Sequence, residues 1–383
     1  MSRSRSIISL DIARVFAAAV VLIYHFLFFS WVDMAGGGGI RDVIGVPLSY
    51  PEAVSSTWWG WVGVEIFFVI SGFVISMSAI GKSASSFAVD RISRLYPALI
   101  FFSLLAFCVI LQVDTVSKEL AVRRLINTLI LWPTGPWIDG VVWTLVTEAM
   151  FYIAITLIIL SGRGGAVEVA ARYALMVVTA FWIVVLLHVL VGFGSIGAAS
   201  LRLATSFGAR VMLLTTGGFF LLGMFGNEIY RKGLSAPRMA WVLVSLACCV
   251  MAIVSRAIGT HGVVQFHQNP AVPVVVWLSC LVVCVVAMVA ETHRPPGRNV
   301  RAFARTLGLM TYPLYLVHEI TGGWLLGRLA EGGLGRWGAA VLAGLIVLAI
   351  SYVFAKWLEP WIRQALGFND LARRVRLRSG SGG

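Results

Sequence analysis

Apolar segments of about twenty residues recur along the whole of this chain. That is the length an α-helix needs to cross the hydrocarbon core of a bilayer. We expect about ten transmembrane helices, at residues 7–30, 61–80, 95–113, 141–160, 173–193, 210–227, 239–255, 271–290, 306–326 and 338–358. Hydrophobic residues make up 59% of the 383 residues and charged residues only 12%. The sequence therefore predicts an all-α, polytopic membrane protein, with residues 1–360 as one transmembrane domain.

The net charge of +13 would suggest a nucleic-acid partner in a soluble protein. Here the basic residues lie mainly in alternate loops between the apolar segments, which is the pattern that fixes membrane orientation. We therefore expect both termini on the cytoplasmic side and no nucleic-acid partner. Residues 361–383 are predicted to form a basic cytoplasmic tail, and its last residues, SGSGG, are typical of a flexible linker.

Two ionisable side chains, Arg14 and His25, lie inside the first apolar segment with ten residues between them. Eleven positions on an α-helix amount to three turns plus about 20°, so the two side chains would share one face, roughly 16 Å apart. An ionisable residue at the centre of a membrane helix costs on the order of 2.5–3.5 kcal/mol, so it usually faces a site or a pathway rather than lipid. The pair is therefore the first candidate for function.

The predicted topology places His25 and several other polar side chains at a similar depth in the membrane. His25, Glu65, Glu148, His318 and Glu319 would all lie in the outer half of their helices. Structural alternatives stay open, because an intramembrane histidine can simply link two helices and a side chain near the interface can reach toward water. A shared site in the outer half of the membrane is the functional hypothesis.

His25 and Glu148 together suggest acyl-transfer chemistry. A neutral imidazole can take a proton from a hydroxyl as its oxygen attacks a carbonyl, and a carboxylate can orient the ring and stabilise the imidazolium that forms. The sequence has no GxSxG motif, and none of its five cysteines stands out as a nucleophile or pairs with histidine at zinc-site spacing. We therefore expect neither a covalent Ser or Cys enzyme nor a metal site.

A cytoplasmic segment before Pro97 carries Arg91 and Arg94, which would share one face of a helix. One interpretation is ordinary positive charge on the inner side. The other is recognition of phosphate groups by two guanidinium groups. A donor molecule with a phosphorylated head at the inner face and a long flexible arm would link these arginines to His25.

Five stretches spread over most of the chain carry a family resemblance. They are Arg14 with His25, GVEIFFVISGFVI at 63–75, RISRLYP at 91–97, WTLVTE at 143–148 and TYPLYLVHE at 311–319. Together they resemble acyltransferase family 3, the membrane O-acyltransferases that acylate sugars of bacterial surface polysaccharides and sometimes antibiotics or other small molecules. Within the second stretch, Gly72 would permit close approach of a helix or a ligand.

The resemblance implies that His25 is the catalytic histidine, Glu148 an essential carboxylate and Arg14 a residue that positions the acyl donor. We expect His25 to act as general base, and a transient acyl-imidazole on its ring stays open as the alternative. It implies acyl-CoA, with acetyl-CoA favoured, as co-substrate from the cytoplasm, and a sugar or glycolipid hydroxyl at the outer side of a bacterial cytoplasmic membrane as acceptor. We accordingly assign donor binding to Arg14, Arg91, Arg94, Ser71 and Tyr96, and acceptor binding to Glu65, Trp143, Tyr315 and His318.

Two other classes of function also fit a membrane protein with buried His and Glu. A proton-coupled exporter or flippase of a glycan precursor would use these side chains as a proton relay and would not consume acyl-CoA. A scaffold for polysaccharide-assembly enzymes would tolerate replacement of Arg14 and His25. The exporter or flippase gives no reason for the arginine pair at the inner face.

Overall fold

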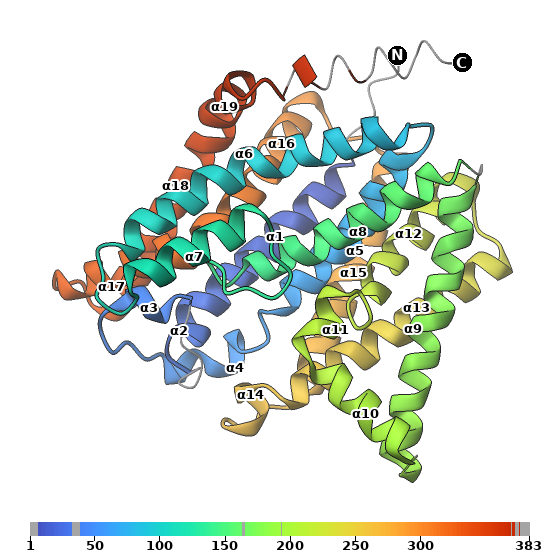
Figure 1. The fold of residues 1–383 in the computed structure, drawn as a ribbon, viewed down its shortest axis with the longest axis horizontal. Coiled ribbons are helices and arrows are strands. Elements are labelled where there is room, and N and C mark those ends of the chain that lie inside the picture. The colour runs from blue at the N-terminus through green and yellow to red at the C-terminus, as the bar shows by residue number, and fades with distance from the viewer. Residues whose placement is uncertain are drawn as a thin grey trace. The chain divides into compact units, whose positions relative to one another are not determined.

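The computed structural model describes residues 7–32, 39–162, 165–192, 194–368, 370–371 and 375, and over these residues it is helical with no strand (Figure 1). Eight helices in the described part are long and apolar enough to cross a membrane. They are Ile8–Val32, Pro51–Ala79, Ala84–Ile110 (α6), Val142–Leu160 (α8), Ala166–Val191 (α9), Ala236–Ile258 (α13), Ala271–His293 (α15) and Arg336–Ala365.

Several of these spans contain more than one element. The first comprises α1 (Ile8–Tyr24), a π-helical segment (His25–Phe29) and α2 (Ser30–Val32), the second ends in α5 (Val62–Ala79), and the last comprises α18 (Arg336–Val353), a π-helical segment (Phe354–Leu358) and α19 (Glu359–Ala365). The remaining elements are α3 (Arg41–Ile44), a 3-10 turn (Pro51–Ala53), α4 (Val54–Thr57), α7 (Lys118–Leu129), α10 (Gly194–Thr205), α11 (Phe207–Val211), α12 (Gly217–Lys232), α14 (His261–Val264), α16 (Arg298–Val317) and α17 (Ile320–Glu331).

Two of the ten expected spans, 210–227 and 306–326, are not among the eight. The first corresponds to α12, which has 16 residues, and the second is divided between α16 and α17, which meet at His318 and Glu319. The first half of α16 is also polar, because it contains Arg298, Arg301 and Arg305. The count of ten and the orientation of the termini remain predictions.

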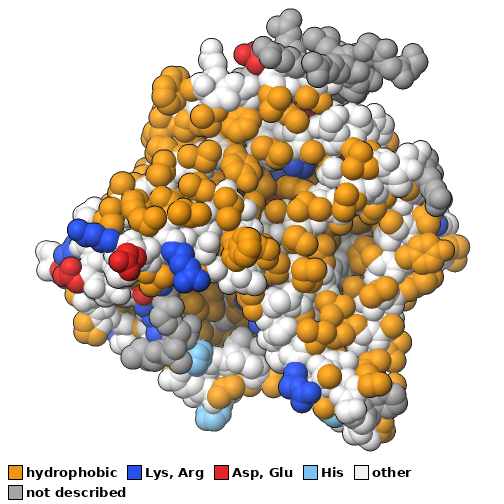
Figure 2. Space-filling model, viewed as in Figure 1, with side chains coloured by type: hydrophobic (Ala, Val, Ile, Leu, Met, Phe, Trp, Pro, Cys, Tyr) orange, Lys and Arg blue, Asp and Glu red, His pale blue; other side chains and the backbone are white. Residues whose placement is uncertain are grey.

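The spanning helices leave much of their apolar surface outside the protein. Only 11% of the most apolar window of α15 and 22% of that of α9 are buried. Hydrophobic side chains cover most of the face drawn in Figure 2, with charged groups confined to a few places. An exposed apolar surface of this extent is unfavourable in water and is stable in the hydrocarbon core of a bilayer. The protein is therefore an integral membrane protein whose helices contact lipid.

The chain divides into two compact units whose segments alternate in the sequence. Unit 1 comprises residues 1–66, 95–143 and 261–366, and unit 2 comprises residues 67–94, 144–260 and 367–383. The last eight residues of the predicted basic tail, 376–383, lie outside the described residues.

In unit 1, the carboxylate of Glu291 on α15 anchors the start of α1. It accepts hydrogen bonds from the backbone N–H groups of Ile8 (3.1 Å) and Ser9 (3.2 Å) and from the Ser9 hydroxyl (2.9 Å). The first N–H groups of a helix have no partner within it, and the positive end of the helix dipole favours an anion there. Glu291 thus fixes the end of the helix that carries Arg14 and His25.

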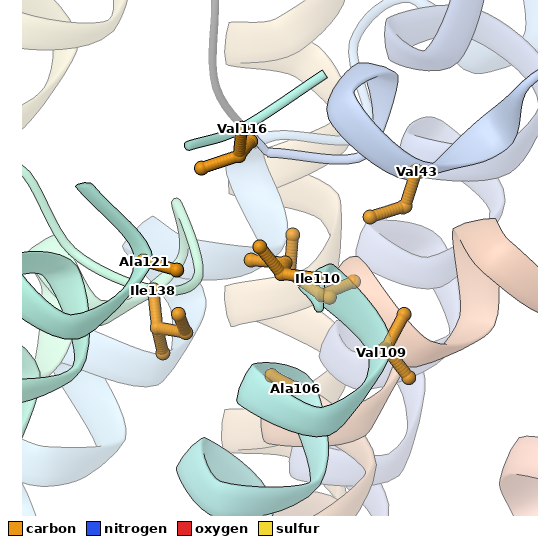
Figure 3. Close-up of a cluster of buried hydrophobic side chains, with 8 residues drawn as sticks. Val43, Ala106, Val109, Ile110, Val116, Ala121 and Ile138 are labelled. Carbon is orange, nitrogen blue, oxygen red and sulfur yellow. The ribbon is translucent and has the colours of Figure 1, made fainter. Parts of the chain in front are cut away.

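A hydrophobic cluster in unit 1 joins short helices to a long one (Figure 3). Its buried side chains come from α3, α6, α7, α17 and the connections between them: Val43, Ala106, Val109, Ile110, Val116, Ala121, Ile138 and Ile320. Ile138 and Ile320 are adjacent in sequence to Asp139 and Glu319. Packing of this cluster therefore positions two buried acidic residues.

In unit 2, glycines allow α5 and α12 to touch through their backbones. A Cβ atom added to Gly72 would lie 2.0 Å from the Phe220 carbonyl oxygen, and one added to Gly223 would lie 2.0 Å from that of Val69. The sequence prediction that Gly72 permits close approach is confirmed. This crossing holds α5, which carries Ser71, against α12.

Gly72→Ala is expected to destabilise the protein by about 1–3 kcal/mol, because the new methyl group would overlap backbone atoms that cannot rotate away. The thermal midpoint of the purified protein in detergent should fall measurably. Gly344→Ala in α18 is the matched control, since outside its own stretch of helix no atom of the described residues lies within 4 Å of its added Cβ. An unchanged midpoint for Gly72→Ala would contradict this packing.

Candidate functional site

His25 lies at the point where the first helix changes from α to π geometry. Its ring nitrogen Nδ1 lies 2.9 Å from the Val21 carbonyl oxygen one turn earlier. Short π-helical segments inside α-helices occur frequently at functional sites, because the extra residue re-orients the side chains around it. The local backbone thus places His25 at the junction between α and π geometry and provides the Val21 carbonyl oxygen as a partner for Nδ1.

His318 lies in the break between α16 and α17 and is 1% exposed. Its Nδ1 lies 2.9 Å from the Tyr315 carbonyl oxygen and 3.2 Å from that of Leu314. The last carbonyl groups of a helix lack partners within it, which explains why a side chain just after α16 bonds there. The helix end therefore fixes the orientation of the buried ring.

The structure brings these two histidines together within unit 1. His318 Nε2 lies 3.2 Å from His25 Nδ1, and the ring centroids are 4.8 Å apart in an edge-to-face arrangement. Both residues were singled out from the sequence, His25 as the base and His318 as an acceptor-binding residue. Their direct contact was not predicted, because 293 positions separate them.

Arg14 forms an ion pair with Asp11, in which its Nη1 lies 3.0 Å from Asp11 Oδ1. Sequence reasoning treated Arg14 as an isolated cation and missed Asp11, although a spacing of three residues places the two side chains on one helix face. Gly308 on α16 lies against this carboxylate, since its added Cβ would be 2.7 Å from Asp11 Oδ1. A predicted donor-binding residue therefore has a protein counter-charge.

Unit 1 also contains a buried pair of acidic side chains, Asp139 and Glu319. The Val141 backbone N–H donates to Glu319 Oε2 (2.9 Å) and Asp139 Oδ1 (3.0 Å), and the Ile320 N–H donates to Asp139. Burial and the neighbouring Glu319 carboxylate raise the pKa of Asp139 well above its usual range. A protonated Asp139 then donates to Glu319, and the pair joins the starts of two helices.

In unit 2, Glu148 on α8 accepts hydrogen bonds from two side chains. The Ser71 hydroxyl donates to Glu148 Oε1 at 2.7 Å, and the Tyr152 phenol donates to the same carboxylate. Ser71 and Glu148 were both predicted site residues, whereas Tyr152 was missed. Its position four residues after Glu148, on the same helix face, was the available signal.

The arginine pair lies on α6, whose helix begins at Ala84, well before the predicted span. The guanidinium of Arg91 lies over the rings of Phe87 (5.6 Å) and Tyr152 (5.9 Å), and its buried Nε has no hydrogen-bond partner among the described residues. Arg94 also lies close enough to Tyr152 to interact electrostatically with it. Two cations therefore accompany the Ser71, Glu148 and Tyr152 side chains in unit 2.

The remaining predicted site residues lie in unit 1. Glu65 is 4% exposed on α5, Tyr315 is 7% exposed on α16, and Tyr96 and Trp143 are partly buried. The contact expected between His25 and Glu148 would join the two units and stays a prediction.

These features define a polytopic membrane protein with two groups of titratable side chains enclosed by its helices, the His25 group in unit 1 and the Glu148 group in unit 2. Residues 7–356, nearly the whole chain, match the family model described as an acyltransferase domain, so the protein belongs to acyltransferase family 3. No significant match to this chain was found among curated proteins or among solved structures.

Proposed function

We propose that the protein is an O-acyltransferase of the bacterial cytoplasmic membrane. It would move an acyl group, with acetyl favoured, from cytoplasmic acyl-CoA to a hydroxyl of a sugar or glycolipid on the outer side. Membership in an acyltransferase family supports the reaction class. The contact of His25 with the buried His318 ring in unit 1 supports His25 as the residue that handles the proton.

The observation that carries the proposal is the 2.9 Å contact between His25 Nδ1 and the Val21 carbonyl oxygen. A carbonyl oxygen only accepts, so Nδ1 carries the proton of the neutral ring and Nε2 is its basic nitrogen. Nε2 would take the hydroxyl proton as that oxygen bonds to the thioester carbonyl carbon. The carbon–sulfur bond then breaks, and His25 returns the proton to the departing CoA thiolate.

Arg91 and Arg94 are proposed to bind phosphate groups of the donor, with Arg14, Ser71 and Tyr96 as further donor contacts. The buried, unpartnered Nε of Arg91 supports this role, because a buried donor group without a partner favours an anionic ligand. Glu65, Trp143 and Tyr315 are proposed to contact the acceptor.

Arg91→Ala is expected to raise the KM for acyl-CoA by about 10- to 150-fold with a smaller change in kcat, because a charge-assisted hydrogen bond to phosphate contributes about 1.5–3 kcal/mol to binding. Initial rates over a range of acyl-CoA concentrations measure the effect. Arg298→Ala, at an exposed position on α16, is the control and should leave the KM unchanged. An unaltered KM for Arg91→Ala would remove this residue from the donor site.

The overall proposal is tested by mass spectrometry of surface glycans from cells with and without the gene. Loss of the gene should remove one acyl mass from a defined sugar, and fragmentation should locate the ester. Glycans with identical acylation but altered abundance at the surface would instead favour the exporter or flippase.

A further inference from the structure

We infer that His318 is a positioning residue for His25, and that it holds the base in the tautomer with Nδ1 protonated and Nε2 basic. This inference rests on the proposed function and deepens it. It replaces the acceptor-binding role that the sequence suggested for His318 with one that acts through His25.

The backbone around His318 determines which of its ring nitrogens carries the proton. Its Nδ1 faces the carbonyl oxygens of Leu314 and Tyr315 at 3.2 and 2.9 Å, and both oxygens can only accept. Nδ1 therefore carries the proton. A neutral imidazole has one N–H, so Nε2 of His318 is an acceptor. The carbonyl groups at the C-terminal end of α16 thus determine which nitrogen of the His318 ring can accept a hydrogen bond.

Because His318 Nε2 is an acceptor, it limits which tautomer His25 can adopt. Its Nδ1 lies between two acceptors, the Val21 carbonyl oxygen at 2.9 Å and His318 Nε2 at 3.2 Å. The opposite tautomer of His25 would place the lone pair of Nδ1 against both of them. His318 therefore disfavours that tautomer further. In that tautomer Nε2 already carries the proton, so it cannot remove one from a hydroxyl.

His318 also stabilises the imidazolium form of His25 that arises during the proposed reaction. When His25 takes a proton at Nε2, its ring becomes an imidazolium and the Nδ1–H group donates more strongly. His318 Nε2 can accept that bond without a rearrangement, and the ring of His318 is itself only 1% exposed. A neutral histidine here performs the orienting task that a carboxylate performs in a Ser-His-Asp triad.

The tautomer can be tested directly by nitrogen NMR of ¹⁵N-histidine-labelled protein in lipid. The His25 signals are assigned by their loss in His25→Asn. We expect Nδ1 protonated and Nε2 unprotonated in the wild type, and a mixture of tautomers in His318→Phe, which keeps a ring but has no acceptor. A wild-type His25 protonated on Nε2 would overturn the inference, whether or not the variant folds.

Kinetics supply the second test. His318→Phe should lower kcat on the order of 10²-fold with little change in either KM, and His318→Gln, whose amide oxygen can accept from His25, should recover much of the loss. A rise in the acceptor KM at constant kcat would overturn the inference in favour of acceptor binding. Absence of acyl transfer by a wild type with the expected tautomer would contradict only the proposed function.

Discussion

His25→Ala is expected to reduce acyl transfer by about 10³-fold or more while the protein still folds and enters the membrane. General base catalysis by a positioned side chain contributes about 10²–10⁴-fold. In the proposed reaction the same nitrogen accepts the hydroxyl proton and returns it to the CoA thiolate, so no other residue would replace it. The rate of CoA thiol release by purified protein, with the acceptor present, measures the effect.

The matched control for this prediction is His293→Ala, which alters an exposed histidine at the end of α15. It should retain wild-type turnover. Size-exclusion profiles and thermal midpoints would confirm that His25→Ala is folded, since removal of a partly buried ring leaves space beside His318. Wild-type turnover by a folded His25→Ala protein would refute the catalytic role.

Glu148→Gln is expected to lower turnover on the order of 10²-fold. Glutamine keeps the shape and can still bond to Ser71 and Tyr152, so the substitution removes chiefly the negative charge. The partly buried Glu148 carboxylate bonds to Tyr152, which lies near Arg91 and Arg94, so its charge contributes to the electrostatics that a substrate would meet there. The measurement is kcat and KM for acyl-CoA, which separates a catalytic effect from a binding effect.

Two comparisons make the Glu148 result specific. Ser71→Ala removes one hydrogen bond to the carboxylate and should have a smaller effect than the loss of its charge. Glu331→Gln, at an exposed position paired with Arg328, should have no effect. Activity in Glu148→Gln equal to that of this surface control would show that the carboxylate is dispensable.

The membrane architecture was predictable because hydrophobic length is a property of local sequence. The prediction of ten spans is not confirmed where a helix is polar or broken, as in α16 and α17, because hydropathy cannot distinguish a span from two helices that meet at His318. It also placed the start of α6 too late. The segment from Ala84 is helical although it is too polar to be recognised as a span.

The candidate side chains were predictable in type but not in their pairing. Buried His, Arg and Glu residues stand out in apolar sequence, and the positions of Asp11 and Tyr152 follow from helical spacing once Arg14 and Glu148 are chosen. The His25–His318 contact depends on packing between α1 and the end of α16. No local pattern encodes a contact over that separation.

Acyl transfer can be measured with purified protein in liposomes that contain acceptor glycolipid, with labelled acyl-CoA supplied at the cytoplasmic face. We predict equal amounts of released CoA and acylated acceptor with the wild type, and neither above background with His25→Ala. Movement of the glycolipid across the bilayer without consumption of acyl-CoA would contradict the account and identify a transporter.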